Sequence, residues 1–176
     1  MKKDDIVWME NIWLKNYKIK FKQKIMRKVV RAFVRNNEWK YLLAKHTGKK
    51  IWVLPGWWME WKESIFKCAK RELKEEFNLD IKLIWDKFEF KTNKILKTYP
   101  NPICSYKIEF KDKKYWTQKR LEYIFLAKIK NNISEIKIQE EEIWEYSFFS
   151  LDEIIKLEDT FEQIREIAEY LKNYAK

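Results

Sequence analysis

Hydrophobic and polar residues change their spacing several times along the first half of the chain, and each change marks a predicted element. Residues 29–34 (VVRAFV) are largely apolar and β-branched, and residues 41–44 (YLLA) follow them after a polar stretch, which predicts a β-hairpin. Residues 51–54 (IWVL) predict a further short strand, which ends before Pro55 because proline pushes the preceding residue towards extended geometry. This part of the chain therefore favours a β-sheet.

The spacing becomes helical after residue 63. Apolar residues then recur three and four positions apart, at Ile65, Phe66, Ala69, Leu73 and Phe77. Residues at this spacing share one face of an α-helix. Ser64 is a suitable N-cap, and Asn78 tolerates the left-handed conformation that often ends a helix. We predict an amphipathic helix between these two residues.

The second half of the chain predicts more strands and then two helices. Strand patterns cover residues 79–90, 103–110, 121–129 and 146–149. Ser150 with Glu153 has the spacing of a capping box, and Thr160 with Gln163 repeats it, so each pair predicts a helix start. The second of these helices is amphipathic, with apolar residues at Phe161, Ile164, Ala168 and Leu171.

The chain has the size and composition of one folded domain. Its 176 residues are 46% hydrophobic, enough for a sizeable core, and they contain neither an internal repeat nor a Pro/Gly/Ser-rich linker. We expect a single α+β domain at residues 25–176 after an N-terminal extension at residues 1–24. No apolar run reaches the length of a membrane span and no signal core is present, while Cys68 and Cys104 form no disulfide framework. We therefore expect a cytoplasmic protein with no membrane partner, and the oligomeric state stays open.

The charge of the chain favours an anionic substrate or partner. The net charge is +11 and the pI is about 9.4. The alternative is a solvated basic surface, because the lysines are spread along the whole chain. The densest local excess is residues 107–120 (KIEFKDKKYWTQKR). We expect Lys114, Lys119 and Arg120 in this stretch to contact phosphate groups, either on a nucleotide or on RNA.

Three acids crowd one side of the predicted helix. At about 100° per residue, Glu72, Glu75 and Glu76 fall within an arc of roughly 100° that borders the apolar face. Like charges this close repel one another, and Mg²⁺ would offset the repulsion because it binds a few carboxylates together with substrate phosphates. The alternative is a solvated charged face, which is common in a chain with 37% charged residues. The turn at residues 54–56 (LPG), whose carbonyls could join the coordination, favours the metal site.

The segment around this helix resembles the Nudix box. That pattern runs glycine, five residues, Glu, seven residues, Arg-Glu, an aliphatic residue, any residue, Glu-Glu, any residue, glycine and an aliphatic residue. The residues that match in register are Glu63, Arg71, Glu72, Leu73, Glu75, Glu76 and Leu79. The turn at residues 54–56 matches the usual lead-in, and the likeness extends over about residues 28–157. So many matches at fixed spacing make the signal strong.

The resemblance implies an α/β/α sandwich with a mixed β-sheet. It also implies an enzyme that hydrolyses a nucleoside diphosphate linked to another group, with Mg²⁺, or alternatively Mn²⁺, as cofactor. Glu75 and Glu76 would be the principal metal ligands. Glu72 would be a further ligand or assist water activation, and the carbonyl of Gly56 would complete the shell.

Other residues receive supporting roles from the same resemblance. Glu63 and Arg71 would brace the loop and the helix. A more distant acid would join the metal site from residues 140–142, and we assign Glu142 to this place. Two alternatives to a nucleotide hydrolase stay open. One is removal of diphosphate from the 5′ end of RNA, and the other is a catalytically silent Nudix-fold module that binds a nucleotide or RNA.

The chain departs from the box at its two glycine positions, Trp57 and Asn78, and it has Lys62 where a glycine usually precedes the box glutamate. Asn78 is benign because asparagine tolerates positive φ. Trp57 is not, because a loop that brings its backbone close to a metal and a diphosphate calls for glycine. Trp58 and Trp61 add two more indoles to the same loop. In the silent-module alternative, this bulk blocks the site.

The tryptophan content suggests a second explanation. The chain has two glycines and ten tryptophans, and together they equal the roughly twelve glycines that average usage predicts. We hypothesise that several of these tryptophans are glycines, encoded by UGA codons that have been translated as tryptophan. Trp39 fits the hypothesis, because it lies where the predicted hairpin calls for glycine.

Overall fold

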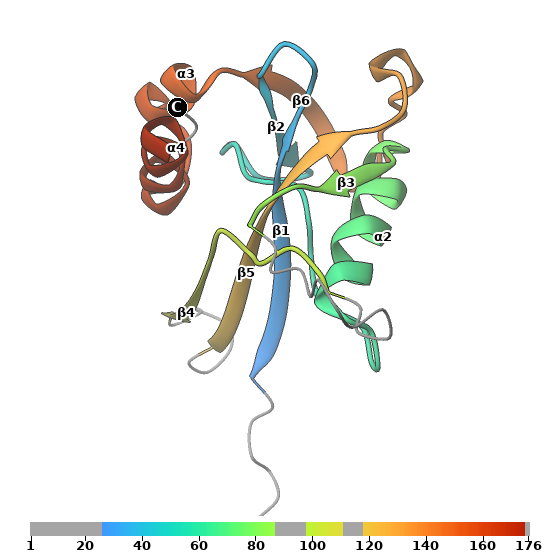
Figure 1. Cartoon of the computed structure of the whole chain (residues 1–176), viewed down its shortest axis with the longest axis vertical. Helices are drawn as coiled ribbons and strands as arrows, with labels where there is room; N and C mark the ends of the chain where they lie inside the picture. The colour runs from blue at the N-terminus through green and yellow to red at the C-terminus, as the bar shows by residue number, and fades with distance from the viewer. Residues whose placement is uncertain (1–25, 87–97, 111–117, 175–176) are drawn as a thin grey trace, which may run out of the picture.

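The structure is a computed structural model that describes residues 26–86, 98–110 and 118–174. Within these residues, a six-stranded mixed sheet forms the centre of the molecule (Figure 1). The strands are β1 (Arg27–Arg35), β2 (Tyr41–His46), β3 (Ile81–Leu83), β4 (Cys104–Phe110), β5 (Gln118–Ile129) and β6 (Ile143–Phe149). Their order is β3-β5-β1-β2-β6, with β4 paired to the first half of β5. β1 runs parallel to β5 and the other pairs are antiparallel.

Helices cover both faces of the sheet. They are α2 (Ile65–Phe77), α3 (Leu151–Lys156) and α4 (Glu162–Tyr174). In Figure 1, α2 lies on one side of the sheet while α3 and α4 lie on the other. Each side has its own core, one with Phe77 and Phe125 and one with Phe33 and Leu171. These layers confirm the predicted α+β sandwich with a mixed sheet.

Helix α2 forms as its sequence predicts, because both of its ends are capped. The Ser64 side chain accepts a hydrogen bond from the Lys67 N–H at 3.3 Å. Asn78 ends the helix in the left-handed region at φ 55°, and its N–H donates to the carbonyls of Leu73 and Lys74. The caps set where the helix begins and ends, and its apolar residues Ala69, Leu73 and Phe77 pack into the core on this side of the sheet.

Two local predictions are wrong. Residues 51–54 form no extended strand, and instead single β-bridges join Val53 to Ala44 and Trp52 to Thr160. Thr160 does not start a capping box, because its hydroxyl donates to the Trp52 carbonyl at 2.8 Å and α4 begins at Glu162. Phe161 is therefore outside the apolar face of α4 and is 43% exposed. At residues 51–54 and at Thr160, a contact with a residue distant in the sequence forms where the sequence predicts a strand and a helix cap.

The other elements follow the sequence prediction more closely. The predicted hairpin, the later strands and the Ser150–Glu153 capping box are all present. The strand expected at residues 79–90 is short, at Ile81–Leu83, and its residues 87–90 lie outside the described part of the chain. Among the described residues, no helix is long and apolar enough to cross a membrane.

The loop before α2 lies along β1 and so places the functional site. β1 and β2 pair at the hairpin end, where Arg35 is opposite Tyr41. Further along, β1 bonds to the loop instead: the Ala32 N–H donates to the Pro55 carbonyl at 3.1 Å, and the Val30 N–H donates to the Trp57 carbonyl at 3.0 Å. The loop thus takes the place of β2 and holds the start of the box against the middle of the sheet.

Candidate active site

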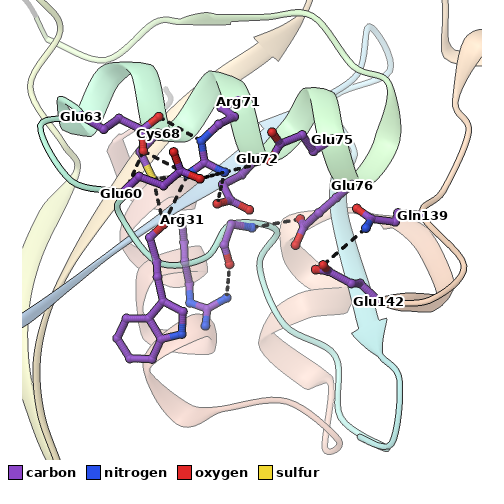
Figure 2. A network of polar contacts seen from close by, with 12 residues as sticks. Arg31, Glu60, Glu63, Cys68, Arg71, Glu72, Glu75, Glu76, Gln139 and Glu142 are labelled. Atoms are coloured by element: carbon purple, nitrogen blue, oxygen red, sulfur yellow. Dashed lines mark hydrogen bonds and ion pairs between the residues drawn. The ribbon is translucent and has the colours of Figure 1, made fainter.

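A cavity of about 300 Å³ lies between α2, the loop before it and the turn before β6. Its walls are Trp57, Trp58, Glu60, Arg71, Glu72, Glu75, Glu76, Gln139 and Glu142. The structure therefore brings the three predicted helix acids, the predicted arginine and the predicted distant acid to one place. Figure 2 shows Glu76 of α2 and Glu142 of the turn with their carboxylates facing the same space.

Glu76 is the most buried acid of the cavity, with 1% of its surface exposed. Its Oε2 accepts a hydrogen bond from the Gly56 N–H at 3.2 Å, while its Oε1 has no partner although it is buried. Burial raises the pKa of Glu76 to about 8, and repulsion from Glu72 and Glu142 adds to this effect. The negative charge of a buried carboxylate with a free oxygen and two acidic neighbours is not offset, and a bound cation would offset it.

Arg71 connects the helix acids to the loop. Its guanidinium makes two bonds to Glu63, from Nε to Oε1 at 3.0 Å and from Nη2 to Oε2 at 2.9 Å. Its Nη1 lies 2.7 Å from Glu72 Oε1 and 2.8 Å from Glu75 Oε2. The hydrogen bonds from Arg71 lower the pKa of Glu63. This geometry is that of a brace between the loop and α2, because one arginine holds acids of both (Figure 2).

The donor set fits a hard cation, although the side chains do not surround one as they stand. Among the described residues, no three carboxylate, imidazole or thiol groups converge closely enough to hold a metal ion. Glu72 and Glu75 are turned towards Arg71, whose positive charge they share. Glu76 is influenced by the charge of Arg31, which lowers its pKa, but its buried Oε1 is left without a partner within the described part of the chain. Oxygen donors with surplus negative charge are the ligands that Mg²⁺ and Mn²⁺ prefer.

Comparison with known families identifies the chain. The family model described as NUDIX domain matches residues 26–171. The chain belongs to the Nudix family. The predicted resemblance is confirmed, and so is the predicted enzyme class of Nudix pyrophosphohydrolases. No curated protein sequence matches the chain significantly.

Solved structures show the same fold at low sequence identity. A NUDIX-family hydrolase from Clostridium perfringens has a TM-score of 0.66 at 19% identity, covering 85% of this chain and 97% of its own. An Ap4A hydrolase from C. elegans has a TM-score of 0.61 at 16% identity, covering 85% and 98%. A UDP-X diphosphatase has a TM-score of 0.57 at 16% identity, covering 92% and 72%.

Gly56 of the Nudix lead-in is held in a conformation that only glycine adopts easily. Its φ is +121°, and a Cβ atom placed on it would lie 2.1 Å from the Val30 carbonyl oxygen. Its own carbonyl accepts a hydrogen bond from Arg31 Nη1 at 3.0 Å. The role of that carbonyl as a metal ligand stays a prediction. Arg31 is a site residue that the sequence analysis missed, and its signal is an arginine within the apolar run VVRAFV.

The three predicted substrate contacts have different positions. Lys114 lies outside the described residues. Lys119 of β5 forms an ion pair with Glu109 at 2.9 Å and does not line the cavity. Arg120 lines a neighbouring cavity and lies 2.6 Å from Glu122 through its Nε. Of the two described residues, Arg120 is therefore the one that lies where a substrate at the metal cavity could reach.

Two tryptophans of the Nudix loop, Trp57 and Trp58, form walls of the metal cavity, whereas Trp61 does not line it. The Trp57 ring lies 5.2 Å from that of His46, and Trp61 is 85% exposed. Among the described non-glycine residues, positive φ angles occur at Trp39, Lys62 and Asn78. Trp39 thus has a glycine-like backbone at φ 61° and an exposed side chain. This combination supports the hypothesis that it is a glycine.

The hypothesis makes a prediction about the gene. We expect UGA at codons 39, 57, 58 and 61, and we expect peptide mass spectrometry of the natively produced protein to show glycine at these positions. Glycine at Trp57 and Trp58 would widen the cavity, because both indoles form its walls. UGG codons at all four positions would contradict the hypothesis and leave a narrowed site.

Proposed function

We propose that this protein is a Mg²⁺-dependent hydrolase that cleaves a diphosphate linkage in a nucleotide or nucleotide derivative. The observation that carries the proposal is the buried Glu76 carboxylate, which has one oxygen without a partner and faces Glu142 inside a cavity. A carboxylate in this state costs free energy unless a cation or a proton offsets its charge. The cavity belongs to the Nudix box, so the cation is the better explanation.

Each acid has a distinct place in this proposal. Glu76, Glu72 and Glu142 would hold the ion, because their charges already interact across the cavity. Glu75 is more exposed, with 53% of its side chain accessible, and would contact the ion or its water shell from the rim. Arg71 and Glu63 would position the loop. The bound ion would neutralise the diphosphate and lower the pKa of an attacking water.

Phosphate hydrolysis needs positioning and electrostatics more than a protein nucleophile, which agrees with this set of residues. The substrate class rests on the net charge of +11 and on the family. Structurally similar proteins include one named as a UDP-X diphosphatase and one named as an Ap4A hydrolase, and both names denote nucleotide derivatives. We extend this class to the present chain as a proposal.

A substrate panel tests the proposal. The purified protein is incubated with Mg²⁺ and a nucleoside triphosphate, a dinucleoside polyphosphate, a nucleotide sugar or a 5′-triphosphorylated RNA. We expect hydrolysis of at least one small substrate, loss of hydrolysis in EDTA, and recovery with Mg²⁺ or Mn²⁺ because both are hard cations. Preference for the RNA would favour the 5′-end alternative. Binding without turnover under every metal condition would contradict the proposal and favour a silent module.

A further inference from the structure

The loop that leads into the Nudix box is bonded to two side chains. The Gly56 N–H donates to Glu76 Oε2 at 3.2 Å. Nη1 of Arg31 donates to the Leu54 carbonyl at 2.8 Å and to the Gly56 carbonyl at 3.0 Å. Figure 2 shows Arg31 and Glu76 contacting the same short stretch of loop. One guanidinium therefore bonds to the peptide groups before and after the one that meets Glu76.

Arg31 is itself held in place by three strands. It lies on β1, and only 11% of its side chain is accessible. Its Nε lies 3.6 Å from Oε2 of Glu122, which is buried on β5. Glu122 in turn accepts a hydrogen bond from the Tyr106 hydroxyl of β4 at 3.0 Å, and its Oε1 lies 2.6 Å from Arg120 Nε. Because these groups fix the carboxylate, the carboxylate fixes the guanidinium.

The loop depends on this side chain for two of its hydrogen bonds. The carbonyls of Pro55 and Trp57 accept bonds from the backbone of β1. The carbonyls of Leu54 and Gly56, which alternate with them, accept bonds from Arg31 instead. Both of these residues are buried, and a buried carbonyl without a donor is costly. Loss of Arg31 would therefore loosen this stretch of the loop even where its backbone pairing with β1 remains.

Resting on the proposed function, we propose that Arg31 is a positioning residue, which fixes the loop so that Glu76 keeps one oxygen bonded to Gly56 and the other free for the ion. In this role Arg31 contacts neither the ion nor the substrate. Removing a group that orients a metal ligand costs about ten- to a hundredfold in metal affinity or activity. Such a loss lowers kcat, whereas loss of a substrate contact chiefly raises KM.

Three variants test the role of Arg31. In Arg31→Ala, Glu122 keeps its contacts with β4 and with Arg120, so no buried carboxylate is left alone. Arg31→Lys keeps the charge but not the planar guanidinium, and it is the variant to measure if Arg31→Ala does not fold. Arg165→Ala is the matched control, because Arg165 of α4 also donates through Nη1 to a backbone carbonyl, that of Leu157, at 3.1 Å.

Hydrogen exchange of single backbone amides tests the positioning role in the metal-free protein. The Gly56 amide reports the bond to Glu76, while the Val30 and Ala32 amides report the pairing of the loop with β1. In Arg31→Ala we expect Gly56 to exchange about tenfold faster, with less than about a twofold change at Val30 and Ala32. Arg31→Lys should show the same pattern to a smaller extent, and the control should show none of it.

Manganese binding and kinetics supply the second readout. Mn²⁺ is titrated into each protein and followed by electron paramagnetic resonance. We expect Arg31→Ala to bind Mn²⁺ about tenfold more weakly and to lose a similar factor in kcat with little change in KM, while the control matches the wild type. Guanidinium ion should restore part of the affinity and turnover of Arg31→Ala, because Arg31 lines a cavity of about 510 Å³ through which a small cation can enter. Sodium ion at the same concentration should not.

The two readouts separate this inference from the proposed function. If the wild type hydrolyses no substrate but the exchange and Mn²⁺ patterns hold, the proposed function fails and the positioning role of Arg31 stands. Equal acceleration of all three amides would show that the whole loop leaves β1, and it would overturn the inference. So would an unchanged Gly56 amide, or a raised KM with unchanged kcat, since the latter is the result for a substrate contact.

Discussion

Replacing Glu76 with glutamine is expected to abolish turnover and, at the same time, to stabilise the metal-free protein. Glutamine keeps the shape of the side chain and can still accept the hydrogen bond from Gly56. It removes the negative charge that would hold the ion, so we expect kcat to fall by roughly a thousandfold. It also removes a buried charge that the folded protein tolerates poorly without a cation. A residue kept for function at the expense of stability shows this pair of effects.

The stability effect has a defined dependence on pH. The pKa of Glu76 is raised from its ordinary value near 4.5 to about 8 in the folded protein. The folded state therefore binds a proton that the unfolded state releases between these pH values, and stability in EDTA falls as pH rises from about 5 to 8. Glu76→Gln lacks this proton, so we expect the variant to be more stable than the wild type by about 2–4 kcal/mol at pH 8 and equally stable near pH 4.

Chemical denaturation in EDTA from about pH 4 to 8 measures this difference. Glu169→Gln is the matched control, because it makes the same change at an exposed position of α4. We expect the control to follow the wild type in stability and in turnover. Mg²⁺ at the upper end of this pH range should stabilise the wild type and the control but not Glu76→Gln. A variant with equal activity, or with lower stability at that pH, would contradict the role that we assign to Glu76.

Replacing Gly56 with alanine is expected to unfold or severely destabilise the protein. The added Cβ would lie 2.1 Å from the Val30 carbonyl oxygen and 2.8 Å from the Arg31 Cα, both of which are backbone atoms that cannot move aside cheaply. The φ of +121° adds strain for any residue with a Cβ. We expect a loss of more than about 3 kcal/mol in the free energy of unfolding.

Gly48→Ala is the matched control for this substitution. Gly48 also has a positive φ, +77°, but nothing lies within 4 Å of the position that its Cβ would take. We expect a loss of about 1 kcal/mol there, because only the backbone conformation is penalised. Urea unfolding of both variants measures the two losses. Equal losses would show that the close approach of the loop to β1 is not the reason for glycine at position 56.

The metal helix and its acids could be predicted because their signals are local. The caps at Ser64 and Asn78 lie next to the helix that they end, and the helical spacing alone places Glu72 and Glu76 on one side. The spacing also predicts that these acids border the apolar face, and both are buried at that border. Local geometry within one helix is sufficient for this part of the site.

The contacts of Arg31 with Glu122 and with Gly56 could not be predicted from the sequence, because these residues meet through long-range pairing. β1 and β5 are parallel and far apart in the sequence, and their register places Val29 opposite Glu122. Arg31 and Glu122 are each a charged residue within an apolar strand, which marks them as unusual but does not say that they form a pair. Nor does the sequence show that the loop at Gly56 replaces β2 beside β1. The sequence shows that charged residues occur within apolar strands, and only the fold shows which of these residues pair with each other.

A cation bound between Glu76 and its acidic neighbours is the central claim, and crystals grown with Mn²⁺ test it most directly. Anomalous scattering at the manganese edge locates the ion without assumptions about the substrate. We expect a peak within coordination distance of Glu76 Oε1, shared with Glu72 or Glu142, and we expect no such peak in Glu76→Gln crystals. A peak elsewhere on the molecule, or one that persists unchanged in Glu76→Gln, would contradict the claim.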